Sequence, residues 1–144
     1  MKITAMILIA SIPFASLCKA DDDASLTGLG VVFSMPKCDD RDHDTRIDMW
    51  IEKNGARFAS GFNIAPGQHF DDPGQYGPFP FSIDAPVTKG YYRGSLTKLT
   101  ITPNGHDTWC TTVTITASFA DGTVIQSTTG GAIKVSEVNA PHSS

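Results

Sequence analysis

The tripeptide His-Asp-Thr occurs twice, at residues 43–45 and 106–108, and each copy lies where a polar segment enters a run of alternating apolar residues. Just around the first copy, Asp40, Asp42 and Asp44 alternate along the chain. An extended or looped backbone can therefore direct several carboxylates toward one centre. Carboxylate oxygens are preferred ligands of Ca²⁺, which takes about six to eight of them. This spacing predicts a calcium site carried by loops.

The other acidic residues extend this pattern. Of the 15 acidic residues 13 are aspartates, and seven of them fall in three polar segments: Asp39, Asp40, Asp42, Asp44, Asp71, Asp72 and Asp107. Asp is typical of turns, because its short side chain bonds to nearby main chain. A solvated turn is therefore the alternative to a metal site at residues 40–44. An EF-hand is excluded, since Thr45 stands where that loop requires Gly and Ile51 stands at its twelfth position.

One histidine also falls in each of the same three segments: His43, His69 and His106. Three imidazoles with an open coordination position suit Zn²⁺, so a small metal-dependent hydrolase is an alternative to a calcium protein. No Gly-x-Ser-x-Gly, His-Glu-x-x-His or phosphate-loop motif is present. Adjacent residues of a strand point to opposite faces, so Asp44 does not orient His43. The sequence favours a non-catalytic protein.

The first residues indicate export. Lys2 precedes a mostly apolar run over residues 3–17, followed by the polar step Cys18-Lys19-Ala20. This pattern predicts a secretory signal peptide at residues 1–20, and the run is shorter than the roughly 20 residues of a spanning helix. The rest, residues 21–144, is long enough for one secreted or periplasmic domain of 144 − 20 = 124 residues, with disordered ends expected at 21–25 and 138–144.

Charge and cysteine content narrow the partners and the covalent structure. Without the leader, nine basic residues face 15 acidic ones, a net charge of 9 − 15 = −6, which argues against nucleic acid and favours a cation. Cys38 and Cys110 are then the two remaining cysteines. In an oxidising compartment we expect them to form a disulfide. Such a bond brings their Cα atoms within about 7 Å and joins the two aspartate-bearing segments.

Period-two alternation recurs along the chain and no convincing helical period does, so the fold class is all-β. Eight strands are expected, near residues 29–35, 46–52, 57–64, 79–83, 98–102, 112–119, 123–127 and 133–135. Asn54-Gly55 and Asp121-Gly122 are typical of hairpin turns. Pro80 indicates an edge strand. Eight short antiparallel strands with these turns predict a single β-sandwich with one disulfide.

Counting strand reversals places the loops. If every strand runs opposite to the one before, the connections at 36–44, 65–78, 103–107 and 128–131 share one end of the sandwich. The turns at 53–56, 84–95 and 120–122 then lie at the other end. All seven aspartates fall at the first end, so we expect the functional site there.

Two segments carry a resemblance to a known family. Residues 39–45 and 103–109, each entering an alternating strand, resemble the loops of C2 and PLAT (lipoxygenase-homology) sandwiches. The resemblance implies that Ca²⁺ binds between Asp-rich loops at one end, where the protein meets a membrane or another surface. Carried over by position, it names as metal ligands Asp40, Asp42, Asp44, Asn104 and Asp107. Asp39, Asp71, Asp72, His43 and His106 are additional candidates.

Aromatic residues crowd the second loop. Phe70 and Tyr76 lie there among glycines and prolines, and either bind a ligand or pack on the edge of the sandwich. The sequence thus predicts a secreted binding module that uses calcium to hold a lipid, glycan or protein surface. A secreted inhibitor or effector that acts by protein contact without metal is the main alternative.

Overall fold

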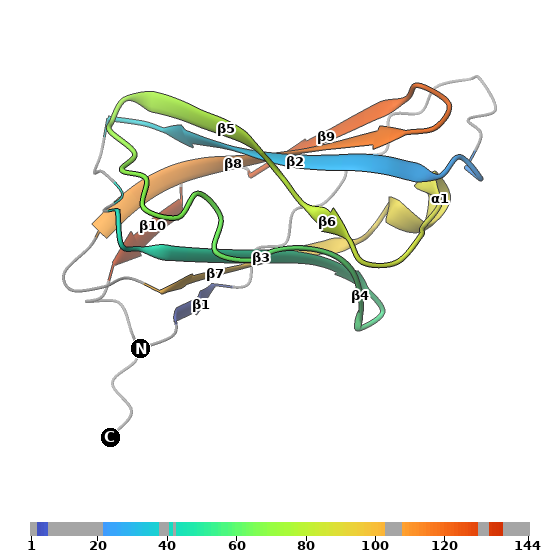
Figure 1. Cartoon of the computed structure of the whole chain (residues 1–144), viewed down its shortest axis with the longest axis horizontal. Helices are drawn as coiled ribbons and strands as arrows, with labels where there is room; N and C mark the ends of the chain where they lie inside the picture. Colours follow the sequence, from blue (N-terminus) through green and yellow to red (C-terminus); the bar gives the residue numbers. More distant parts are fainter. Residues whose placement is uncertain are drawn as a thin grey trace.

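The structure is a computed structural model that describes residues 3–5, 22–37, 41, 43–102, 108–129 and 133–136. Within these ranges the chain forms β-strands and one helical turn (Figure 1). The strands are β1 (Ile3–Ala5), β2 (Leu26–Met35), β3 (Arg46–Lys53), β4 (Ala56–Gly61), β5 (Gly74–Pro80), β6 (Ser82–Ile83), β7 (Leu96–Thr102), β8 (Thr108–Phe119), β9 (Val124–Thr128) and β10 (Ile133–Ser136). The helix is α1 (Lys89–Tyr92).

The strands form two antiparallel sheets that lie one above the other in Figure 1. One sheet has the order β1-β7-β3-β4-β6. The other has the order β10-β8-β2-β5, and β9 also pairs with β8. The prediction of an all-β fold is confirmed, and the pair of sheets is sandwich-like.

Alternation along the strands explains how the two sheets bury one core. Every second residue of a strand points to the same face, and the inward residues of both sheets join a single buried cluster. Its fully buried members from the central strands include Val31, Phe33, Ile47, Met49, Ile51, Val113 and Ala117. In the predicted strands at 29–35, 46–52 and 112–119, these buried residues are the alternating apolar ones, so the core face predicted for these three strands is correct.

The segment from Gly74 to Ile83 differs from the prediction. Residues 74–78 were expected to be loop, yet they open β5, which pairs with β2 in one sheet. The chain then changes sheets: the Phe81 N–H donates to Leu29 O at 3.1 Å, whereas Ser82 pairs with Ser60 in the other sheet. The expected fourth strand at 79–83 is therefore the junction of β5 and β6. Pro80 does lie on an edge strand, as predicted.

A second difference concerns the last strands. β9 pairs with residues 114–118 of β8, and β10 pairs with residues 108–111 of the same strand. Both run antiparallel to β8 along the same side, so the chain does not reverse between them. The connection at 128–131 was predicted at the loop end of the molecule, and that prediction is wrong. Thr128, the last residue of β9, pairs with Thr114 in the middle of β8, and β10 runs in the same direction as β9.

The opposite end holds α1 and the tight turns (Figure 1). Thr88 caps α1, and its side chain accepts a hydrogen bond from the Tyr91 N–H. Residues 22–25, expected to be disordered, pack here: Ala24 is buried and its carbonyl accepts from the Lys89 N–H at 2.8 Å. The segment at 84–95 contains this helical turn, and the strands on either side of it, β6 and β7, run in opposite directions as predicted.

Candidate functional site

Strand register places the ends of four strands together. Met35 at the end of β2 pairs with Gly74 at the start of β5, and Arg46 at the start of β3 pairs with Thr102 at the end of β7. The described parts of the segments at 36–45 and 62–73 therefore leave the sheets at one end, on the left in Figure 1. For these two segments the loop-end prediction is confirmed. The third segment, 103–107, follows Thr102 and lies outside the described residues.

Arg41 holds the first two of these segments against each other. Its side chain is fully buried, although it lies in the most acidic stretch of the sequence. The main chains of Arg41 and Phe70 exchange two hydrogen bonds of 3.1 Å. The guanidinium carbon lies 4.6 Å from the centre of the Phe70 ring, a cation–π distance.

The guanidinium also satisfies main-chain carbonyls of both segments. Nη1 donates to Ala65 O at 3.0 Å and to Gln68 O at 3.1 Å. Nε donates to Thr45 O at 3.2 Å, and Nη2 donates to the same oxygen. A planar fork of donors suits this arrangement, because it binds several carbonyls at fixed angles. We call the Arg41 side chain with these partners the Arg41 clamp.

The aromatic residues of the second loop pack inward. Phe70 is fully buried and stacks on Tyr76 with ring centres 4.4 Å apart, and it also contacts Phe33 and Phe79. The Tyr76 hydroxyl donates to Asp71 O at 3.1 Å. Of the two interpretations of these aromatics, packing holds for Phe70, whose ring no ligand can reach.

The predicted metal ligands fall into two groups. Asp44, His43 and Asp71 are exposed and Asp72 is half-buried at the loop end. His69 Nδ1 lies 2.9 Å from Asp71 Oδ1. The other candidates, Asp39, Asp40, Asp42, Asn104, His106 and Asp107, lie outside the described residues. Within the part of the chain that is described, no three His, Cys, Asp or Glu side chains gather closely enough to hold a metal ion.

Cys110 lies in β8 and is only 3% exposed. Alternation places it on the face opposite Thr111 and Val113, and it does not join the core cluster. Cys38 lies outside the described residues, so the pairing of the two cysteines stays a prediction.

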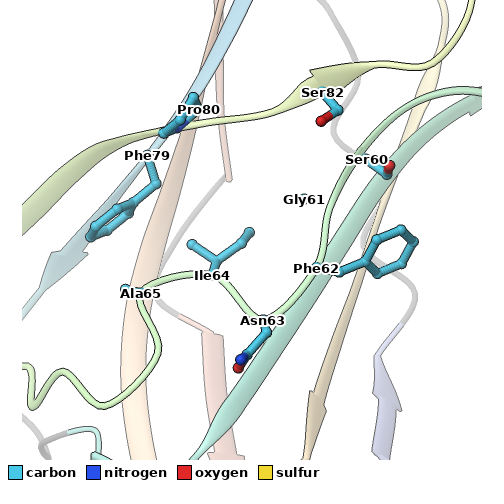
Figure 2. Close-up of a pocket in the computed structure, with 9 residues that line it drawn as sticks. All are labelled: Ser60, Gly61, Phe62, Asn63, Ile64, Ala65, Phe79, Pro80 and Ser82. Carbon is cyan, nitrogen blue, oxygen red and sulfur yellow. The ribbon is translucent and has the colours of Figure 1, made fainter.

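A pocket of about 420 Å³ adjoins the Arg41 clamp. Figure 2 shows it between the end of β4 and the β5–β6 junction, with the Ile64 side chain pointing into the opening and the Phe62 ring pointing away. The clamp and the pocket share Ala65, whose carbonyl binds Arg41. Nine residues line the pocket: Ser60, Gly61, Phe62, Asn63, Ile64, Ala65, Phe79, Pro80 and Ser82.

Two residues in the left-handed conformation shape this wall. Asn63 and Ala65 both have φ of 51°, which Asn adopts readily but which is uncommon for Ala. They turn the chain on either side of Ile64, whose N–H donates to Ile47 O at 2.8 Å. A left-handed Ala persists only where surrounding contacts hold it, and here the Arg41 clamp fixes the Ala65 carbonyl.

Sequence reasoning missed Arg41 and the pocket. Arg41 stands among four aspartates, and a basic residue in such a sequence is typically exposed to solvent. The alternation of apolar residues along strands gives no information about the burial of a loop residue. The pocket depends on the change of sheets at Phe81, which no local pattern predicts. The one available signal was Pro66-Gly67, which marks a turn near the left-handed residues.

No helix in the described ranges is long and apolar enough to cross a membrane. Comparisons of the chain with protein-family models, with curated proteins and with solved structures found no match.

Proposed function

We propose that this protein is a secreted, non-catalytic binding module that holds Ca²⁺ among the aspartates of its loop end and meets a lipid, glycan or protein surface there. The Arg41 clamp carries the proposal. It joins the segment that bears Asp39 to Asp44 to the segment that bears Asp71 and Asp72. These two acidic segments repel each other. They are held together by hydrogen bonds from the Arg41 guanidinium to main-chain carbonyls of both segments.

The charge balance supports a bound cation. Arg41 supplies one positive charge at this end, and its donors are directed to main-chain carbonyls. The carboxylates of Asp44 and Asp71 stay exposed. Hard carboxylate oxygens favour Ca²⁺ over softer metals. The resemblance to C2 and PLAT loops points to the same ion.

A disulfide between Cys38 and Cys110 is part of this proposal. From Gly28 to Ser34, the numbers of paired residues of β2 and β8 sum to 146, as in Phe33 with Val113 and Ser34 with Thr112. Continuing this register would set residue 36 opposite Cys110, two residues before Cys38. A bond there would tie the first aspartate segment to the start of β8, beside the third loop.

A calcium titration of metal-free protein tests the proposal. A ligand at about 100 times its Kd stabilises a protein by roughly 2.7 kcal/mol, so the melting temperature should rise by several degrees. Asp44→Asn should reduce this rise, because an amide is a weaker ligand for a hard cation. His43→Ala is the matched control next to it and should leave the rise unchanged.

The same variants test the zinc alternative. If Zn²⁺ were the natural ion, His69→Ala and His106→Ala would lose metal retained through purification, whereas Asp44→Asn would keep it. That ordering would contradict the calcium proposal and favour a metal-dependent hydrolase. A protein indifferent to both ions would favour recognition without metal.

The disulfide has its own test. On the chain-entropy model, a bond that closes a loop of about 70 residues contributes on the order of 4 kcal/mol, so Cys110→Ala should lower the free energy of unfolding substantially. Denaturant unfolding of the oxidised protein and of this variant measures the difference. Two free thiols in the purified, unfolded protein would contradict the bond.

A further inference from the structure

The pocket beside the Arg41 clamp has an open strand edge along one wall. β4 and β6 pair at only two positions, Ala59 with Ile83 and Ser60 with Ser82. On one side of these pairs the Asp84 N–H donates to Phe58 O at 2.8 Å. On the other side the ladder stops, because the chain leaves for the second sheet.

The register of this ladder shows which residue beyond β4, among those described, has no strand residue paired with it on the β6 side. Alternate residues of an antiparallel strand direct their main-chain groups to the same neighbour, so Phe58 and Ser60 face the β6 side. Continuing this alternation past Gly61, the last residue of β4, would set Phe62 on the same side. The residue that would pair with Phe62 is Pro80. Pro80 instead pairs with Gly30 in the other sheet.

The main chain of Phe62 is therefore available. Within the described residues neither its N–H nor its C=O forms a hydrogen bond, and the residue is 53% exposed. The neighbouring main-chain donors are used: the Asn63 N–H donates to Asp48 Oδ1 at 2.7 Å and the Ile64 N–H to Ile47 O. Phe62 thus leaves one donor and one acceptor just beyond the end of β4, among the residues that line the pocket.

The opposite wall is apolar and cannot continue the ladder. Pro78 and Pro80 have no N–H, so β5 offers no main-chain donor at either position. The Ile64 side chain points into the opening between Pro80 and Gly61, and the Ser82 hydroxyl lies at its rim (Figure 2). The space has the size of a ligand pocket, roughly 300 Å³ or more.

We propose that this pocket binds an extended peptide segment of a protein partner, which pairs its main chain with Phe62 and inserts one apolar side chain between Ile64, Phe79 and Pro80. This inference names the partner class of the binding module and rests on the proposed function. A strand-edge N–H and C=O pair complements a peptide group, which is the basis of strand addition. Of the two aromatic side chains that line the pocket, the more exposed one, Phe62, points its ring away from it (Figure 2), which disfavours stacking on a sugar ring.

Charge adds a second feature of the peptide. The chain has an excess of acidic residues, and Asp71, on the same 62–73 segment as four of the pocket residues, is 76% exposed and lies 2.9 Å from His69. The nearby cations are engaged, Arg57 with Asp84 and Arg46 with Asp48. The peptide therefore carries basic residues beside its apolar one.

A defined peptide series tests the proposal. The probes are acetylated and amidated pentapeptides Lys-Val-X-Val-Lys, in which X is Leu, Phe or Glu. NMR shifts of the Ile64 and Ser82 amides report binding in EDTA, which separates this result from the calcium proposal. Peptides with Leu or Phe should shift both amides, and the Glu peptide should bind at least roughly tenfold more weakly, as expected for a charge placed on an apolar wall.

Two matched pairs of variants locate the contact. Phe62→Pro deletes the donor and should weaken binding by roughly tenfold, whereas Phe62→Ala removes only the ring and should not. Ser82→Tyr should block the pocket, whereas Ser82→Ala should leave binding nearly unchanged. Ser82 is exposed, so its variants keep the test decisive if Phe62→Pro unfolds the chain.

Four results would overturn the inference. The first is that no peptide of the series shifts the pocket amides at millimolar concentration. The second is that Leu and Glu peptides bind equally, and the third is that Ser82→Tyr binds like the wild type. The fourth is that cellohexaose or phosphocholine vesicles shift these amides while the peptides do not. If peptides bind in EDTA and calcium has no effect, the pocket stands and only the calcium proposal fails.

Discussion

Arg41 gives the loop end its order through one side chain. Burying a charge is costly unless it is well paired, and here the guanidinium meets three main-chain carbonyls and the face of Phe70. Those carbonyls belong to loops, where no neighbouring strand in the described part of the chain donates a hydrogen bond to them. The Arg41 side chain therefore provides the hydrogen bonds that a paired strand would provide elsewhere.

Substituting lysine for Arg41 tests this role. Lysine keeps the charge but has no planar fork, so Arg41→Lys should lower the free energy of unfolding by about 2–4 kcal/mol. Arg46→Lys is the control, because Arg46 is exposed and its pairing with Asp48 contributes at most about 1 kcal/mol. Urea unfolding compares them. Equal, small effects of the two changes would show that the clamp does not stabilise the loops.

Asp121 provides a pH test at the opposite end. Hydrogen bonds from the buried Lys89 first, and then from Thr123, lower the pKa of Asp121 from 3.8 to about 2. A carboxyl whose pKa is depressed on folding stabilises the fold above the unfolded pKa, and that stabilisation is lost as pH falls through the folded pKa. The free energy of unfolding should therefore decrease between pH 4 and pH 2. Asp121→Asn should remove this component of the slope, and an unchanged slope would contradict the assignment.

Among the strands, the alternation of apolar and polar residues predicted correctly those that bury one face in the core. Residues 29–35 and 112–119 alternate strictly, and both lie in long central strands. The pattern failed at β5, where Gly74, Gly77, Pro78 and Pro80 read as loop residues. Pairing with β2 fixes that segment as a strand, and pairing between distant segments leaves no periodic signal.

β1 offers a test of the leader. Ile3–Ala5 pairs with Leu99–Ile101 at the edge of the first sheet, within the residues predicted to be a signal peptide. β7 already pairs with β3 at seven positions, from Leu96 to Thr102. We therefore expect residues 21–144 alone to fold, with a melting temperature within a few degrees of that of the full chain. Circular dichroism melts compare the two, and loss of cooperative unfolding on removal of residues 1–20 would contradict this.

For the whole molecule, reversal counting predicted three loops at one end, and the registers of β2, β3, β5 and β7 agree for the two segments with described residues, 36–45 and 62–73. It failed for β9 and β10, because a strand can break and continue without reversing. The candidate site was predictable only as a location. The residues that organise it, Arg41 and the left-handed residues Asn63 and Ala65, depend on contacts between segments far apart in sequence.

We propose that one cation orders the loop end as a unit. Amide hydrogen exchange of the metal-free protein, with and without Ca²⁺, measures this ordering. We expect slower exchange on calcium binding in all three segments, 36–45, 62–73 and 103–107, with no change at α1 or in the β8–β9 turn. Asp44→Asn should diminish the protection in all three together. Exchange that stays the same in these segments at millimolar calcium, the range that fills weak extracellular sites, would contradict it.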